Sequence, residues 1–215
     1  MHSEVVIPIF PLGLVMLPEM SLPLHIFEER YKSMTKACID QHKEFGIVYF
    51  SGKQLQAIGC TARIEKILKR YADGRLDIMT RGANRFSIRE LFDEKPYLQA
   101  EIDFFDDRPK EGTDAETLQK LADRGFQLLR QINATTEQYN EDRFTNQPDY
   151  KTASFIITAC EGFSFEEKQQ FLEMTSTSKR LSSGLQALEK LLERIHITHK
   201  ITRIIGGNGN LPKSL

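Results

Sequence analysis

The apolar residues of this chain change their spacing near residue 110, and this change constrains the fold more than any other feature. Before it, apolar and polar residues alternate in short runs, as in Val5–Ile9 and Ala62–Glu65. After it, apolar residues recur every three or four positions, as in Leu118–Ile132. Strands have a side-chain period of two and helices one of 3.6. The sequence therefore predicts an α+β fold: a β-rich barrel or sandwich followed by a C-terminal helical bundle.

A polar connector marks the expected boundary. Residues 106–112 read Asp-Asp-Arg-Pro-Lys-Glu-Gly, with a proline and a glycine among charges. We therefore predict a β-domain over residues 1–110, a helical bundle over 111–205 and a flexible tail over 206–215, where glycines and asparagines end the last helix.

Within the first part, several local signals predict individual strands. Phe45–Phe50 is a short run of β-forming residues, and Asp73-Gly74 predicts a hairpin turn. The alternation slips near Lys66, which indicates a bulge. Further strands are expected around Phe86 and over Tyr97–Phe104. One helix, near residues 28–42, is expected to interrupt this part, because its apolar residues follow a helical spacing.

In the second part, four helices are expected, near residues 118–132, 150–160, 164–173 and 181–195, with a polar link over 133–148. Ser164 and Glu167 form a capping-box pattern, in which each side chain can bond the other residue's backbone N–H. The apolar face of Leu188–Ile195 could pair two chains into a homodimer. Packing into the core of the bundle explains the same residues equally well.

Charge and cysteine content exclude several classes of protein. The net charge of −1 gives no general attraction for nucleic acid or for an anionic membrane. The three distant cysteines are no disulfide framework; they fit buried thiols in a reducing compartment. The prolines at 8, 11, 18 and 23 interrupt the apolar opening, so we expect neither a secretory signal nor a membrane span. The expected location is the cytoplasm.

Motifs for catalysis are incomplete. The glycines before Lys53 lack the spacing and the hydroxyl of a phosphate-binding loop. His196 and His199 lie one helical turn apart but have no local acidic or cysteine partner for a metal, so exposed histidines are favoured. Cys38 and His42 could form a catalytic pair, but Cys38 falls on an apolar face and a packed thiol is favoured. We therefore predict no catalytic, cofactor-binding or metal-binding residue.

Two basic segments have alternative interpretations. Residues 81–86, Arg-Gly-Ala-Asn-Arg-Phe, could hold an anion between two guanidinium groups, or could form a solvated turn with Phe86 in the core. Ile67–Tyr71 mixes basic and aromatic side chains as RNA-binding strands do, but nearby acids favour an ordinary solvated strand face.

The opening stretch over residues 10–31 is unusual, because it carries three prolines among apolar residues and then turns abruptly to charge at Glu28. Proline donates no hydrogen bond to a sheet, so this stretch is not expected to run as a central strand. We predict an edge strand, a crossing and the start of a helix, which acids in the first turn stabilise.

The sequence of this stretch resembles that of a known protein family. Phe10-Pro-Leu, Leu17-Pro and Leu22-Pro-Leu-His-Ile-Phe-Glu-Glu-Arg-Tyr31 are similar to the start of the amino-terminal, substrate-binding domain of ATP-dependent Lon proteases. The similarity continues over Ile58–Ile64 and through Asp73-Gly-Arg-Leu to Arg85-Phe86. It returns over Glu166–Glu173 and at Arg180-Leu181, and so covers most of residues 5–195.

The resemblance implies a PUA-like β-domain joined to helices, and a non-enzymatic module that captures unfolded polypeptides or a partner protein such as a protease or chaperone. In Lon the ATPase and protease domains follow this region; we expect neither activity here, as in the stand-alone bacterial form. We expect the site at the proline-rich edge, with basic rims. Its candidate residues are Pro23, His25, Phe27, Tyr31, Arg81 and Arg85. The alternatives are an RNA-binding PUA-like protein and an enzyme with a dispersed site.

Overall fold

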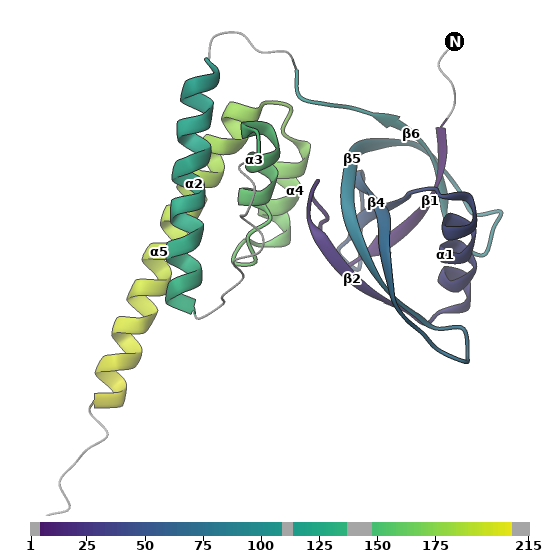
Figure 1. Cartoon of the computed structure of the whole chain (residues 1–215), viewed down its shortest axis with the longest axis horizontal. Coiled ribbons are helices and arrows are strands. Elements are labelled where there is room, and N and C mark those ends of the chain that lie inside the picture. The colour runs from purple at the N-terminus through teal and green to yellow at the C-terminus, as the bar shows by residue number, and fades with distance from the viewer. Residues whose placement is uncertain (1–4, 109–113, 137–147, 208–215) are drawn as a thin grey trace, which may run out of the picture.

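The computed structural model describes residues 5–108, 114–136 and 148–207. A β-rich part with one helix is followed by a helical part, so the predicted α+β fold is confirmed (Figure 1). The elements of the first part are β1 (Val5–Leu12), β2 (Ser21–Ile26), α1 (Glu29–Gln41), β3 (Phe45–Phe50), β4 (Leu55–Arg70), β5 (Leu76–Phe92) and β6 (Gln99–Phe104). Those of the second are α2 (Ala115–Thr136), α3 (Tyr150–Thr158), α4 (Phe165–Glu173) and α5 (Thr177–Gly207).

The six strands form one sheet in the order β2-β5-β4-β3-β1-β6, and β5 also pairs with β6. This last pairing closes the sheet into a barrel. The first half of β5 pairs with β2, whereas its second half pairs with β6. Consequently β2 lies outside the closed ring. Among the described residues it pairs with β5 alone, and it has a free edge.

The prolines of the opening stretch occupy two different positions. Pro23 lies on the edge strand β2, as expected. Pro11, however, lies in β1, which runs between β3 and β6, so the prediction that this stretch avoids the middle of a sheet was wrong there. The reason is that β1 changes partner halfway: Val5–Pro8 pair with β6 and Ile9–Leu12 with β3. Each half needs ladder bonds on one side only, so a proline is tolerated.

The long strand β5 corrects a second expectation. Residues 81–86 were expected to form an anion site or a solvated turn with Phe86 in the core. Phe86 is buried as expected, but β5 continues through these residues, with a shift in its pairing with β4 between Gly82 and Arg85. The predicted hairpin at Asp73-Gly74 is confirmed, with Gly74 at a φ of 83°. The bulge expected near Lys66 is also present, because the pairing of β4 with β5 shifts register on both sides of it.

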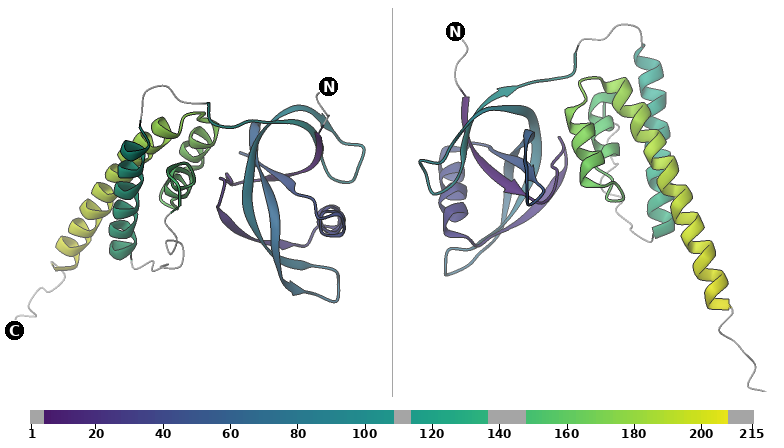
Figure 2. Two further views of the ribbon diagram at one scale, coloured as in Figure 1. Left: turned by 45° about the horizontal axis from the view of Figure 1, so that its top comes forward. Right: turned by 180° about the vertical axis from the view of Figure 1, so that it is seen from behind.

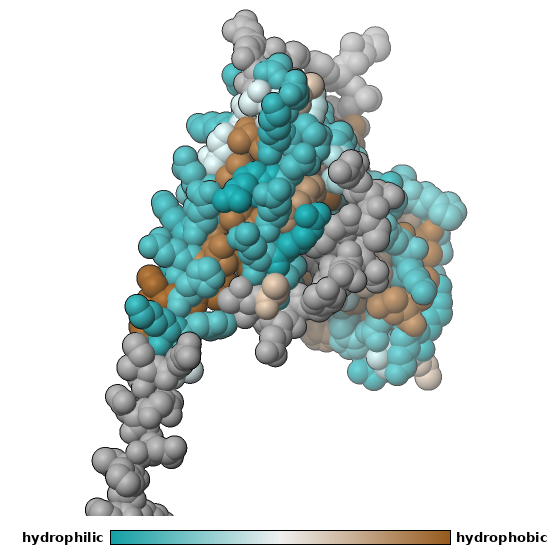
Figure 3. All heavy atoms as spheres, turned by 60° about the vertical axis from the view of Figure 1, so that its left-hand side comes forward, coloured by the Kyte–Doolittle hydropathy of each residue, from teal (hydrophilic) through white to brown (hydrophobic). Residues whose placement is uncertain are grey.

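The helical part packs α2 against α5, with α3 and α4 between this pair and the barrel (Figures 1 and 2). Leu188 and Leu191 of α5 are buried in the core that α2 and α3 share, so core packing accounts for this face. Pairing with a second copy stays a prediction. Near the end of α5, Ile197 and Ile201 are half exposed, and apolar surface gathers there (Figure 3). Within the described residues, no helix has the length and apolar character needed to cross a bilayer.

The capping box expected before α4 is present in both directions. The Ser164 hydroxyl accepts a hydrogen bond from the Glu167 N–H, and the Glu167 carboxylate accepts one from the Ser164 N–H. The tail expected to be flexible is helical over residues 206–207, and its remainder lies outside the described residues.

Replacing Ser164 by Ala is expected to lower the free energy of unfolding by about 1 kcal/mol, because one N–H at the helix start loses its acceptor. Chemical denaturation measures the change. Ser182→Ala, at an exposed position within α5, is the matched control and should change the stability by less than about 0.5 kcal/mol. Equal effects of the two substitutions would contradict a role for the cap.

Candidate functional site

The outer face of β2 carries three of the residues predicted from the sequence. Leu22, Leu24 and Ile26 pack into the barrel core, and the alternation of a strand therefore turns Pro23 and His25 to solvent. Phe27 follows directly and is 59% exposed, the largest exposure among the large apolar side chains described. An exposed proline, histidine and phenylalanine at alternate positions form a surface on which apolar groups can dock.

His25 joins this surface to the hairpin between β4 and β5. Its ring lies 5.9 Å from that of Phe27, roughly parallel, and 5.8 Å from that of Tyr71, edge to face. Its Nδ1 lies 2.5 Å from a carboxylate oxygen of Asp77, and the Tyr71 hydroxyl donates to the other oxygen at 2.8 Å. These contacts orient the rings. We call Pro23, His25, Phe27 and Tyr71 the β2 patch.

Asp77 holds the β2 patch together electrostatically. Its pKa is lowered, first by the hydrogen bond from His25 and then by that from Tyr71, with a smaller contribution from the charge of Lys69. A carboxylate that accepts bonds from both rings fixes their orientation at neutral pH. The sequence offered no signal for this role, because Asp77 lies 52 residues from His25.

The other three predicted residues do not join the β2 patch. The Tyr31 ring is buried and stacks on Phe10 at 4.0 Å, so it belongs to the core. Arg81 bonds the Glu65 carboxylate at 2.5 Å and lies 3.5 Å from that of Glu19, at the other end of β2. Its hydrogen bond with Glu65 is the main cause that raises the pKa of Arg81.

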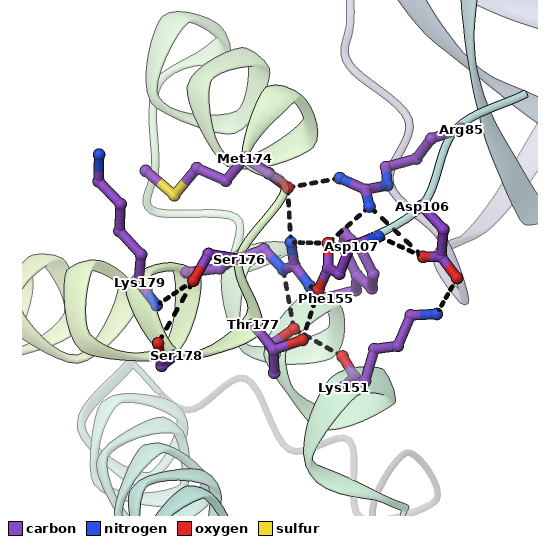
Figure 4. A network of polar contacts seen from close by, with 12 residues as sticks. Arg85, Asp106, Asp107, Lys151, Phe155, Met174, Ser176, Thr177, Ser178 and Lys179 are labelled. Atoms are coloured by element: carbon purple, nitrogen blue, oxygen red, sulfur yellow. Dashed lines mark hydrogen bonds and ion pairs between the residues drawn. The ribbon is translucent and has the colours of Figure 1, made fainter. Parts of the chain in front are cut away.

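Arg85, which was expected at an exposed basic rim of the site, is only 3% exposed. It lies in a polar network where the barrel meets the helices (Figure 4). Its guanidinium bonds Asp107 at 2.6 Å and the backbone oxygens of Leu172 and Met174. The expectation of a basic rim at Arg85 was therefore wrong, because the helical part covers this position.

Asp107 is the centre of this network. It follows β6 and also bonds Arg180 of α5, at 2.6 and 3.1 Å, and the Thr177 hydroxyl. Arg180 is fully buried and lies 3.8 Å over the Phe155 ring. The Asp107 carboxylate thus pairs with two buried cations, Arg85 from the barrel and Arg180 from the helical part. These ion pairs fix the two parts of the chain against each other.

The described surface has hollows near both of these regions. One of about 360 Å³ lies at the junction and is lined by Pro18, Phe104, Lys151 and Phe155, among others. Another of about 440 Å³ lies between α1 and the β4–β5 hairpin. Tyr71 lines this second hollow and also belongs to the β2 patch, so the patch extends from the face of the sheet toward a concave surface.

The candidate catalytic and metal residues show no reactive arrangement. Burial raises the pKa of the Cys38 thiol to about 11, so it stays protonated, as expected of a packed thiol. His196 and His199 are exposed on α5. Among the residues that the structure describes, no group of three or more His, Cys, Asp or Glu side chains could hold a metal ion.

The fold and the exposed surface define a class of protein: a closed β-barrel fixed to a helical part, with an aromatic patch on an added edge strand. The family described as the ATP-dependent protease La (LON) substrate-binding domain matches residues 6–190. The chain belongs to this family, and the resemblance in the opening stretch is confirmed.

The curated relatives are longer proteins. A Lon protease of Anaeromyxobacter dehalogenans and Lon protease 2 of Myxococcus xanthus are each 27% identical to this chain over 94% of its length. The chain spans about a quarter of the length of these relatives, 25% and 26% respectively.

Two solved structures share the fold. A Lon N-terminal domain protein from Xanthomonas campestris has a TM-score of 0.63 and 20% identity, covering 85% of this chain and 98% of its own. The N-terminal domain of a Mycobacterium avium complex Lon protease has a TM-score of 0.65 and 18% identity, covering 88% and 98%. At such identities the likeness concerns the fold.

Proposed function

We propose that this chain is a polypeptide-binding module that docks extended or unfolded segments on the β2 patch. The observation that carries the proposal is the exposure of Phe27 directly after β2, a strand whose Pro23 and His25 face solvent and which pairs with β5 along its whole length. The description of the family as a substrate-binding domain supports it. A rigid aromatic surface gives contact area at a small cost in side-chain entropy.

Docking through side chains fits β2 better than the addition of a strand. A peptide that extends a sheet relies on main-chain bonds along the edge strand. Pro23 lacks an N–H in the middle of the six-residue strand, and prolines on edges oppose such pairing. The side chains of the β2 patch would therefore contribute most of the binding energy.

Replacing Phe27 by Ala is expected to weaken binding of a fluorescently labelled, permanently unfolded protein, such as reduced and alkylated lactalbumin, about tenfold. The loss corresponds to roughly 1–2 kcal/mol of apolar contact. Fluorescence anisotropy at low and moderate salt measures the dissociation constant. Because Phe27 is exposed, the fold should change little.

Phe50→Ala, at another exposed phenylalanine that lies on β3 away from the β2 patch, is the matched control. Its dissociation constant should equal that of the unchanged protein. The proposal fails if the unfolded protein does not bind at tens of micromolar, or if both substitutions weaken binding equally.

A further inference from the structure

Beside the β2 patch, the sheet presents a row of cations. Residues paired across neighbouring strands lie side by side on the same face. Three such lines cross β2, β5 and β4 on the outer face: Ser21, Arg81 and Arg63; Pro23, Met79 and Lys66; and His25, Asp77 and Lys69. We call Arg63, Lys66 and Lys69 the basic row. All three are exposed.

The carboxylates of this region are already engaged. Asp77 bonds His25 and Tyr71, Glu65 bonds Arg81, and Asp73 bonds Arg75. These partners occupy the carboxylates, although the charge of Lys69 still contributes to lowering the pKa of Asp77. Among the described residues, none of the three cations of the row forms an ion pair; Lys69 lies 4.5 Å over the Tyr71 ring. The face therefore carries a positive charge that the net charge of −1 conceals.

The spacing links the basic row to the β2 patch. Neighbouring strands lie about 4.8 Å apart, so β4 is about 10 Å from β2 across β5. An extended chain covers about 10 Å in three residues. A single segment could therefore place an apolar side chain on the β2 patch and an acidic side chain on Lys66 or Lys69, because Pro23 and Lys66 share one line and His25 and Lys69 share another.

We infer that the outer face of β2, β5 and β4 selects extended polypeptide segments in which an acidic residue lies about three positions from an aromatic or aliphatic one. This inference rests on the proposed function and specifies the class of substrate. The β2 patch supplies apolar contact, and the basic row supplies the charge that favours acidic over neutral segments. Exposed charges act mainly on association rate and selectivity.

The test compares two labelled peptides that differ only at one position, with Glu or Gln three residues from a central Phe. The Glu peptide should bind about tenfold more tightly at low salt, and the difference should shrink at roughly 0.5 M salt. The double variant Lys66→Glu/Lys69→Glu should lose this preference and bind the two peptides equally. Fluorescence anisotropy gives all four dissociation constants.

The control variant Lys53→Glu/Lys190→Glu makes the same change of net charge at exposed lysines outside this face, and should keep the preference. Equal binding of the two peptides by the unchanged protein would overturn the inference and leave the proposed function intact. If neither peptide binds, the proposed function fails as well. If labelled single-stranded RNA binds more tightly than both peptides, with a steep loss in salt, the basic row serves nucleic acid and the inference is wrong.

Discussion

Replacing Asp107 by Asn is expected to lower the free energy of unfolding by about 3–5 kcal/mol, because two buried guanidinium groups lose the carboxylate to which both are hydrogen-bonded. Arg180 is fully buried and Arg85 nearly so. Water solvates both charges in the unfolded chain but not in the folded protein, so each needs a partner there. The carbonyls of Leu172 and Met174 and the Phe155 ring still contact these cations, but they carry no full charge. Urea denaturation measures the loss.

Asp106→Asn is the matched control, since this neighbouring carboxylate is 66% exposed, pairs with Lys151 on the surface and lies farther from Arg85, at 3.6 Å, than Asp107 does. Surface pairs contribute about 0–1 kcal/mol, so this change should be small. Equal losses for the two substitutions would show that the network at Asp107 does not stabilise the junction.

The same network should make the free energy of unfolding depend on pH. Burial alone would raise the pKa of Asp107, but the hydrogen bonds from Arg180 and Thr177 and the charges of both arginines hold it at about 2, below its ordinary 3.8. A carboxyl whose pKa is lower in the folded than in the unfolded state stabilises the fold. This contribution is fully present above the unfolded-state pKa and is lost as the pH falls through the folded-state pKa. The stability difference between the unchanged protein and Asp107→Asn should therefore shrink between pH 4 and pH 2.

Replacing Gly82 by Ala is expected to cost about 3 kcal/mol or more, because a Cβ there would lie 2.1 Å from the Leu17 backbone oxygen. The Gly82 N–H donates to the Met20 oxygen at 3.0 Å, and the Gly82 oxygen accepts from the Glu19 N–H at 2.9 Å. These bonds hold the loop that leads into β2. The substitution should therefore shift the loop, and binding at the β2 patch should weaken together with stability.

Gly13 provides the control for this prediction, since a Cβ there meets nothing within 4 Å. Gly13→Ala should leave the stability within about 0.5 kcal/mol of the unchanged protein. Thermal or chemical denaturation of both variants, with the anisotropy assay, separates the effects. A Gly82→Ala protein as stable as Gly13→Ala would show that the loop adapts freely.

The positions of the candidate residues show where local reasoning holds. Pro23, His25 and Phe27 lie together because strand alternation, a local rule, places Pro23 and His25 on one face and Phe27 follows directly. Tyr31 was grouped with them by proximity in the chain, but the helical period of α1 turns its ring into the core against Phe10. Arg85 was expected to be exposed, and a helical segment almost 90 residues away covers it. No local pattern indicates such a cover.

The sequence by itself determined the two hydrophobic periods, the hairpin at Asp73-Gly74, the cap at Ser164 and the family resemblance. Each depends on residues a few positions apart, or on sequence motifs that relatives share. Only the tertiary structure decided which polar side chains are buried and which surfaces remain free. The partner change along β1, the enclosure of Asp107 with two arginines and the joining of His25 to Asp77 all depend on contacts between distant segments. Burial and long-range pairing are properties of the whole packed chain, and no short pattern determines them.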